Sequence, residues 1–328
     1  MKNKGPFTIK EIKGLPAGTQ FWGKYLVKDK SIRKTREGKN ITHLQISDKS
    51  GEMKAVVWDS CQQAGVVETG AVIGLLGDMG IYNQQVQVTA KRIKVLEEDP
   101  QAYMKSPDRK IQELRRDLEA KIASISDPHM KKLLERIFTS ARWELFSKAP
   151  AAKAVHHNYI GGLIEHTLMV TELCDRAAGL YPNINRDLMI TGAILHDIGK
   201  IEEFQIGVLP DYTEIGKLVG HIVLAYELLS QEIKNMREEG LPFPELLEKM
   251  LKNMLLSHHG SLEFGSPVLP LFPEALLLHA MDDLDAKLYV FFNKIEEHED
   301  NDNPFTPYDS FHAQQFYTPR YRYSEQEE

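Results

Sequence analysis

The chain has 328 residues with a formal net charge of -7, and 42% of its residues are hydrophobic, 27% charged and 9% aromatic. This composition excludes a disordered or collagen-like protein, and the length predicts about two folded domains. Two cysteines exclude a disulfide framework and a cysteine-rich zinc site, and no run approaches the ~20 apolar residues of a membrane helix, so we expect a cytoplasmic protein with no membrane partner.

Charge is distributed unevenly along the chain. Residues 1–100 contain 16 Lys and Arg against 11 Asp and Glu, whereas the rest of the chain contains 24 against 36. A basic front segment joined to an acidic remainder predicts a division of labour, in which the front domain faces a polyanion.

Short β-rich runs separated by turn residues occupy residues 19–95. Apolar and polar residues alternate in 43–47 and 53–58, and DKSG at 48–51 predicts a hairpin turn between them. About five strands, with a short helix expected at 60–67, predict a Greek-key barrel of the OB type, for which an SH3-like barrel is the nearest alternative. We place this nucleic-acid-binding domain at residues 1–97.

A basic loop, expected at residues 28–40 between the first two strands, is the candidate contact for nucleic acid. Loops at this position of OB folds commonly bind oligonucleotide backbones, and aromatic residues beside them can stack on unpaired bases. A solvated hairpin tip and aromatic core residues are the alternative interpretations. The residues assigned to this contact are Lys28, Lys30, Arg33, Lys34, Arg36, Lys39, Trp22 and Tyr25.

The second half of the chain is predicted to be helical. Residues 98–112 are charged, contain two prolines and are expected to form a linker. After it, apolar residues recur every three or four positions, which predicts an all-α domain at 113–299 and an irregular tail at 300–328. Helices are expected at 162–180, 186–198, 214–236, 244–258 and 273–298. The predicted fold class is therefore α+β and multidomain, with a five-stranded barrel followed by a helical bundle.

Histidine and aspartate side chains interrupt the apolar faces of five expected helices. Each would cost about 1–3 kcal/mol if left unpaired, so one shared partner in the bundle is favoured over separate hydrogen-bonded core histidines. Imidazole and carboxylate groups suit a divalent transition metal. We predict one ion held by His166, His196, Asp197 and Asp282, and a second held by His221 with His258, His259 or both, with Asp197 bridging the two.

The order His166, His196-Asp197, Asp282 resembles the H…HD…D signature of HD-domain metal-dependent phosphohydrolases, an all-α fold. More narrowly, the chain resembles the YhaM-type 3′→5′ exoribonucleases of Gram-positive bacteria, which join an OB-fold domain to an HD domain. The matching stretches are HH at 156–157, GGLIEH at 161–166, ILHDIGK at 194–200, GH at 220–221, LSHHG at 256–260, DDLDAK at 282–287 and FYTP at 316–319.

The resemblance implies manganese or cobalt as cofactor, with two ions per site, and single-stranded RNA as substrate. It also implies release of nucleoside 5′-monophosphates from a 3′ end, and it selects Asp282 as the ligand over its neighbours in DDLD. Single-stranded DNA as a further partner and assembly into a homo-oligomer are compatible with the sequence.

Four residues are candidates for catalysis in a mechanism in which divalent ions activate a water for attack on phosphorus. Asp197 bridges the ions, and Lys200 either meets a phosphate oxygen or simply ends a helix as a cation favoured by the dipole. His157 and Lys153 are candidates for contact with the substrate phosphate or leaving group. Asp285 could orient a ligand from behind.

Two other functions stay open at this point. One is hydrolysis of a small nucleotide by the HD domain, with the barrel serving in regulation. The other is a non-enzymatic nucleic-acid adaptor with a structural metal.

Overall fold

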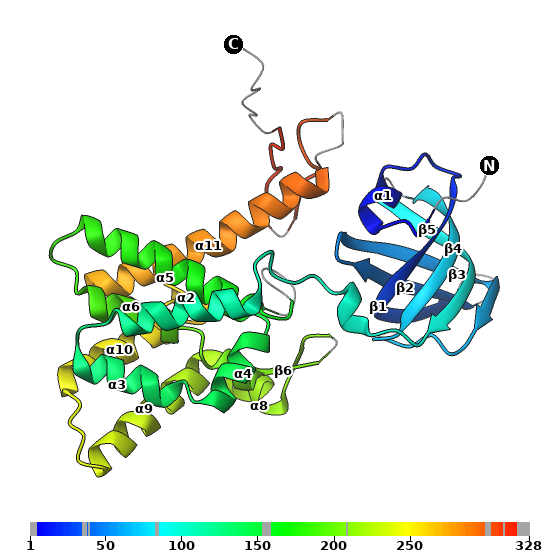
Figure 1. The fold of residues 1–328 in the computed structure, drawn as a ribbon. Coiled ribbons are helices and arrows are strands. Elements are labelled where there is room, and N and C mark those ends of the chain that lie inside the picture. Colours follow the sequence, from blue (N-terminus) through cyan, green and yellow to red (C-terminus); the bar gives the residue numbers. More distant parts are fainter. Residues whose placement is uncertain are drawn as a thin grey trace. The chain divides into compact units, whose positions relative to one another are not determined.

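The computed structural model describes residues 5–34, 38, 40–82, 85–152, 159–207, 209–298, 303–310 and 312–319. The chain forms two compact units, one made of Met1–Lys105 with Phe292–Glu328 and the other of Ser106–Phe291 (Figure 1). We keep the boundaries near residues 97, 112 and 299 as proposed domain limits. Within the parts of the chain that the structure describes, no helix combines the length and apolar character that a membrane crossing requires.

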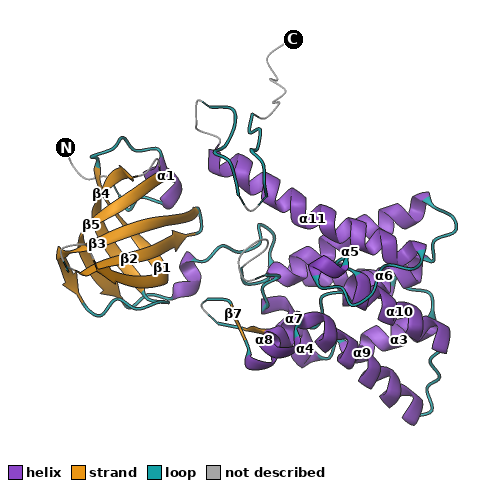
Figure 2. Ribbon diagram, turned by 180° about the vertical axis from the view of Figure 1, so that it is seen from behind, coloured by secondary structure: helices purple, strands orange, loops and turns teal. Residues whose placement is uncertain are grey.

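The first unit is built on a closed five-stranded barrel, visible from behind in Figure 2. Its strands follow the order β1-β2-β3-β5-β4, and β4 pairs with β1 to close the barrel. The parallel pair is β3 with β5, and the other neighbours are antiparallel. This topology confirms the predicted OB-type barrel. The strands are β1 (Gln20–Lys34), β2 (Asn40–Asp48), β3 (Gly51–Ala64), β4 (Val72–Tyr82) and β5 (Gln85–Leu96).

A short helix that the sequence reading missed joins the barrel core. Helix α1 (Ile9–Lys13) begins with a capping box, in which the Thr8 hydroxyl accepts from the Glu11 amide and the Glu11 carboxylate accepts from the Thr8 amide. Ile9 and Ile12 are fully buried in the same apolar cluster as the inward side chains of the strands. The helix therefore extends the core of a small barrel.

Two predictions for the barrel are wrong. The helix expected at 60–67 is absent, because β3 continues to Ala64 and its last residues pair with β5. The basic segment expected as a loop is mostly strand, because β1 runs to Lys34 and pairs with β2 up to Asn40. In both places the pairing with a neighbouring strand determines the local structure, which sequence spacing does not reveal.

The second unit is a helical bundle with one small hairpin. Its elements are α2 (Ile111–Ala123), α3 (Pro128–Ile137), α4 (Ser140–Lys148), α5 (Gly162–Leu180), α6 (Arg186–Leu195), α7 (Lys200–Glu203), β6 (Phe204–Gln205), β7 (Asp211–Tyr212), α8 (Glu214–Val219), α9 (His221–Glu238), α10 (Glu245–Ser257) and α11 (Pro273–His298). A short 3-10 turn lies at Leu262–Phe264 in this unit, and another lies at Pro100–Tyr103 in the first unit. This arrangement confirms the predicted helical domain, to which the β6–β7 hairpin is an unpredicted addition.

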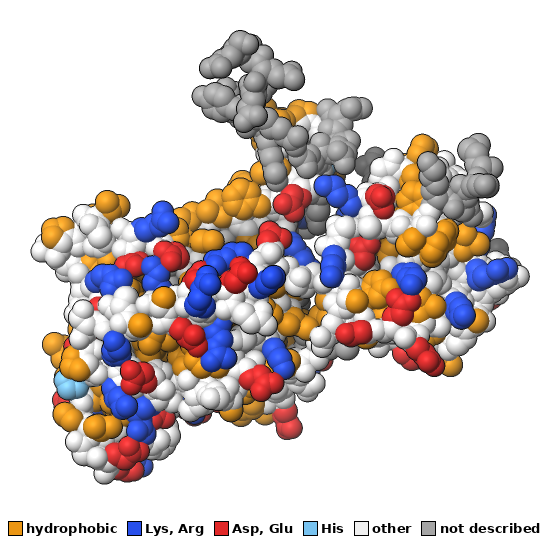
Figure 3. All heavy atoms as spheres, in the orientation of Figure 1, with side chains coloured by type: hydrophobic (Ala, Val, Ile, Leu, Met, Phe, Trp, Pro, Cys, Tyr) orange, Lys and Arg blue, Asp and Glu red, His pale blue; other side chains and the backbone are white. Residues whose placement is uncertain are grey.

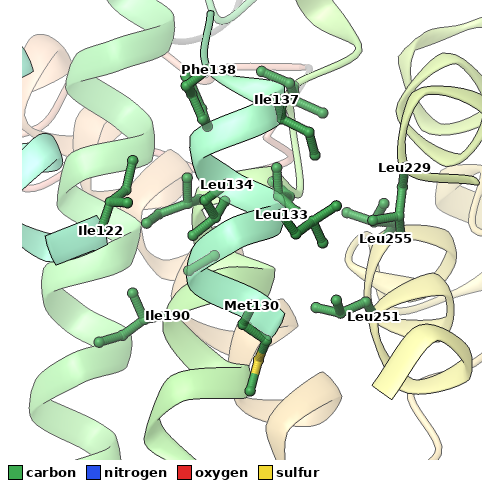
Figure 4. Packing of buried hydrophobic residues seen from close by; sticks show 14 of the residues in the cluster. Ile122, Met130, Leu133, Leu134, Ile137, Phe138, Ile190, Leu229, Leu251 and Leu255 are labelled. Carbon is green, nitrogen blue, oxygen red and sulfur yellow. The ribbon is translucent and has the colours of Figure 1, made fainter. Parts of the chain in front are cut away.

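Helix α3 packs into the apolar core of the bundle. Figure 4 shows Leu133 on the side of α3 toward Leu229 and Leu255, and Leu134 on the side toward Ile122. These side chains are buried, and each buried Leu or Ile stabilises the fold by about 1.5–3 kcal/mol relative to an exposed one. The helices that carry the polar residues are thus held by apolar packing on their other faces.

Two helix boundaries differ from the expected ones, and each difference changes the position of a histidine relative to its helix. The helix expected at 186–198 ends at Leu195, so His196 lies just past its end. The helix expected at 214–236 is two helices, because Gly220, with φ of 80° and ψ of 153°, breaks it. His221 is consequently the first residue of α9 rather than an interior one. A glycine tolerates this positive φ at little cost.

Part of the C-terminal tail is ordered. Isolated bridges join Phe305 to Tyr317 and Asp309 to Gln314. Phe316 is 1% exposed between them. The described tail residues form no helix or regular strand, as expected for 300–328.

Candidate functional site

The predicted metal ligands come together inside the helical unit. They are carried by α5, the turn after α6, the start of α9, the turn after α10 and the middle of α11. In that order they are His166, His196 with Asp197, His221, His258 with His259, and Asp282.

A first ligand set is formed by His166, His196, Asp197 and Asp282. His166 Nε2 lies 3.1 Å from Asp282 Oδ1, 3.5 Å from Asp197 Oδ2 and 3.3 Å from His196 Nε2. Both histidines are fully buried, and Asp197 is 2% exposed. Nitrogen and oxygen atoms from three separate elements therefore face a common point, as a divalent ion requires.

A second ligand set lies beside the first and shares Asp197 with it. Ligand atoms of His221, His258 and His259 all lie within 4.8 Å of one another. Asp197 Oδ1 is 3.5 Å from His221 Nε2 and 3.7 Å from His258 Nε2. Its other oxygen, Oδ2, lies 3.3 Å from His196 Nε2. One carboxylate thus directs one oxygen to each set, which is the geometry of a bridging ligand.

Three atoms between the two sets are buried without a hydrogen-bond partner among the described residues. They are Asp197 Oδ1, His221 Nε2 and His258 Nε2. Each unpaired buried polar atom costs about 1–3 kcal/mol, and these three face one another. A divalent cation accepts electron pairs from all of them, so the donor set fits a metal site.

Every histidine of the two sets has its Nδ1 next to an oxygen. A neutral ring donates its Nδ1–H to such an acceptor, and this leaves the lone pair of Nε2 for a metal. The acceptors are Asp285 Oδ2 for His166 (2.7 Å), the Ala193 carbonyl for His196 (2.7 Å), Glu203 Oε1 for His221 (3.1 Å), the Leu255 carbonyl for His258 (2.7 Å) and the Phe264 carbonyl for His259 (2.8 Å).

Glu203 is a residue of the candidate site that was not predicted from the sequence. It is 7% exposed, and its Oε1 also lies 3.1 Å from the backbone nitrogen of His221. The sequence shows two adjacent acids, Glu202 and Glu203, of which Glu202 is exposed. No signal in the sequence distinguishes them, because α7 is only one turn long and its orientation is set by packing.

Burial and neighbouring charges shift the pKa values within the site. Although burial opposes it, hydrogen bonds to Asp282 and Asp285 raise the pKa of His166 to about 10. Burial is the main cause that lowers the pKa of both His258 and His259. These two rings are therefore neutral near pH 7, whereas His166 must give up a proton to bind a metal.

Lys200 is buried beside Asp197. Its Nζ lies 2.6 Å from Asp197 Oδ2, and against the effect of burial the charges of Lys200 and His196 hold the pKa of Asp197 well below its usual range. Lys200 begins the four-residue helix α7 and lies in its single turn, so its position decides neither the phosphate contact nor the interaction with the helix dipole.

The glycine at position 199, within HDIGK, is required for steric reasons. A Cβ on Gly199 would lie 2.1 Å from the carbonyl oxygen of His221 and 2.7 Å from the amide nitrogen of Ala225. Only a residue without a side chain lets the turn that carries Asp197 approach the first turn of α9 so closely.

The remaining aspartates of DDLD point in different directions. Asp283 is on the outside, where it pairs with Lys287 at 2.7 Å. Asp285 is buried against His166, in the orienting position that was predicted. His279 contacts the backbone carbonyl of His258 through Nδ1 at 2.9 Å and is an ordinary hydrogen-bonded histidine.

The predicted nucleic-acid residues of the barrel do not form one group. Lys28 and Lys30 each pair with a glutamate of the same unit, whereas Arg33 and Lys34 are exposed at the end of β1. Trp22 is half-buried. Tyr25 is fully buried and its hydroxyl donates to a backbone carbonyl at 2.7 Å, so the prediction that it stacks on a base is wrong.

Basic and acidic side chains are interspersed on each unit over the face shown in Figure 3. The basic excess of residues 1–100 is therefore not gathered into a single patch on the face in view. Four predicted site residues lie outside the described residues: Lys153, His157, Arg36 and Lys39.

Comparisons with known proteins match both units. Residues 163–287 match the HD domain family, and residues 26–96 match the OB-fold nucleic acid binding domain family. The 3′-5′ exoribonuclease YhaM of Geobacillus sp. (strain WCH70) is 31% identical over 275 residues, which cover 82% of this chain and 83% of that protein. The protein of the same name from Oceanobacillus iheyensis is 32% identical over 286 residues, covering 85% and 88%.

Among solved structures, a replication protein A heterotrimer bound to ssDNA matches 28% of this chain and 80% of that chain. The sequence identity is 15% and the TM-score 0.24. A TM-score this low does not indicate a shared function.

Proposed function

Because the chain belongs to the family of the 3′-5′ exoribonuclease YhaM, we propose that it shortens single-stranded RNA from the 3′ end and releases nucleoside 5′-monophosphates. Membership of this family and the HD domain make the chain a metal-dependent hydrolase of the 3′-5′ exoribonuclease type. Its OB-fold domain makes it a nucleic-acid-binding protein.

The main observation behind the proposal is that Asp197 lies between the two ligand sets and belongs to both. Its two oxygens face two different histidine sets, and the atoms between the sets are buried and unpaired. We assign His166, His196, Asp197 and Asp282 to one divalent ion, and His221, His258 and His259 with Asp197 to a second. The imidazole and carboxylate ligands suit a divalent transition metal, and the resemblance to the family favours manganese or cobalt.

When bound, the ions supply an activated water and neutralise charge on the attacking and leaving oxygens. The side chains around them do the rest. Asp285 and Glu203 hold the proton of His166 and His221 on Nδ1, away from the ions. Lys200 stabilises the ionised Asp197 and brings a cation to the site, where a phosphate oxygen gains negative charge.

The barrel is proposed to hold the RNA strand. Arg33 and Lys34 are exposed cations at the end of β1 and, among the described members of the predicted group, are the best placed to contact phosphates. Phosphate contacts of this kind position a strand without reading its sequence. We therefore expect the enzyme to accept single strands of varied sequence.

The proposal is tested with a 5′-labelled single-stranded RNA, purified protein and Mn²⁺. Stepwise shortening of the labelled strand, abolished by EDTA, is the expected result. Asp197→Ala should abolish it, whereas Asp283→Ala, which removes a partly exposed acid from the same helix as Asp282, should not. Intact RNA beside hydrolysed mononucleotide would overturn the proposal in favour of a small-nucleotide hydrolase.

A further inference from the structure

The strand pairing of the barrel is interrupted at one place on β5. The parallel pairing of β3 with β5 stops at Val57 and resumes at Gln62. On β5 this interruption spans the single residue Lys91, which the register between β4 and β5 also skips. Bulges of this kind re-aim side chains and are frequent beside binding sites.

A pocket of about 400 Å³ lies at this interruption and is called the β3–β5 pocket below. Its volume falls within the range of about 300–1,000 Å³ that is typical of small-ligand sites. Trp58, Gln62, Leu76, Lys91 and Arg92 are among its lining residues. The pocket thus combines an aromatic wall, the aliphatic side chains of Leu76 and Ala90 and two cations.

Trp58 lies on the outside of the barrel and is 42% exposed. Its partner on β2 is Ile41, and the partner of Ile41 on β1 is Arg33. Directly paired residues of neighbouring strands share a face, so these three side chains form a row across the barrel. The exposed cation at the end of β1 and the aromatic wall of the pocket therefore belong to one surface.

The cations of the pocket are held in place by neighbouring polar groups. Arg92 Nε donates to Gln62 Oε1 at 3.0 Å, and Lys91 Nζ lies 2.6 Å from Asp78 Oδ2. The guanidinium is thereby fixed at the wall of the pocket. An aromatic face beside fixed cations is complementary to a planar base attached to a phosphate.

We propose that the β3–β5 pocket binds one unpaired nucleobase, stacked on Trp58, with an adjoining phosphate facing Lys91 and Arg92. The inference rests on the proposed function, because it names where the RNA strand contacts the barrel. Stacking on a π face does not discriminate strongly between bases, which agrees with an enzyme that follows a strand of varied sequence.

The test compares binding of two strands to the full chain by fluorescence anisotropy. One is a 5′-labelled single-stranded RNA and the other is a strand of the same length made of abasic nucleotides, both in EDTA. Trp58→Ala should weaken binding of the RNA by about 5- to 100-fold and leave binding of the abasic strand unchanged. Trp58→Phe should retain most of the RNA affinity, because it keeps a ring.

Tyr181→Ala is the matched control, since Tyr181 is an exposed aromatic residue of the helical unit. It should leave both affinities unchanged. Wild-type RNA binding by Trp58→Ala, or equal weakening for RNA and abasic strands, would overturn the proposal. A matched DNA strand should lose the same factor, and a loss confined to RNA would overturn the assignment to the base.

These readouts do not depend on hydrolysis. If the labelled RNA were not shortened in Mn²⁺, the proposed exonuclease activity would fail while the binding comparison still decided the role of the pocket. Conversely, normal shortening at saturating RNA together with unchanged binding by Trp58→Ala would overturn only the pocket.

Discussion

Replacing Glu203 by alanine should weaken metal binding at the second ligand set. Glu203 Oε1 lies 3.1 Å from both Nδ1 and the backbone nitrogen of His221, and Glu203 is 7% exposed. Without this acceptor the Nδ1–H of the largely buried His221 ring loses its partner, at a cost of about 1–3 kcal/mol. The ring can then place its proton on Nε2, which cannot ligate. We expect Mn²⁺ affinity at this set to fall by about 10- to 100-fold.

Calorimetric titration of the full chain with Mn²⁺ measures this effect. Two binding events are expected, of which Glu203→Ala should weaken one and spare the other. Glu202→Ala is the control, because Glu202 is the exposed neighbour in the same helix. Asp285→Ala should weaken the binding event that Glu203→Ala spares, since Asp285 orients His166 in the first set.

The reasoning would be refuted if Glu203→Ala bound both ions with wild-type affinity while its thermal unfolding was unchanged. It would also be refuted if Glu203→Ala and Asp285→Ala weakened both events equally, because the two sets would then not form separate sites.

Three further predictions follow from the same geometry. Since the pKa of His166 is raised to about 10, Mn²⁺ binding near pH 7 should release about one proton and tighten as the pH rises toward that value; calorimetric heats independent of buffer ionisation would contradict this. Gly199→Ala should destabilise the chain by about 1–3 kcal/mol, since its Cβ would meet the His221 carbonyl, and an unchanged Tm would contradict this. Joint replacement of Arg33 and Lys34 by alanine should reduce the salt slope of RNA binding by roughly 2, while hydrolysis of a small phosphodiester stays unchanged; an unaltered slope would exclude these contacts.

The convergence of the proposed ligands could be predicted because each one interrupts an apolar stretch of the sequence that has helical spacing. A buried His166 and a buried His196 each require a polar partner, and the structure brings their Nε2 atoms within 3.3 Å. The orienting acid Glu203 could not be predicted, because its role depends on how a one-turn helix is rotated. The break at Gly220 was missed since apolar periodicity continues on both sides of it.

The barrel topology was predicted, but not the length of its strands. Cys61 and Ala64 are spaced three apart, as on a helix, and alternation is lost where β3 bulges away from β5. Long-range pairing decides the structure there, and a single sequence does not show it. The same bulge forms the β3–β5 pocket, so the pocket could not be predicted from the sequence for the same reason.

The histidines of the two ligand sets differ in the sequence separation between each ring and the acceptor of its Nδ1–H. The acceptor for Nδ1 of His196, and likewise of His258, is a carbonyl three residues earlier in the chain. The orientation of these two rings is therefore set as soon as the local turn forms. His166 depends on Asp285, 119 positions away in α11. Metal binding at the proposed site would therefore report completed tertiary assembly, because a chain shortened before α11 would keep the local acceptors of His196 and His258 but lack both Asp282 and the acceptor of His166.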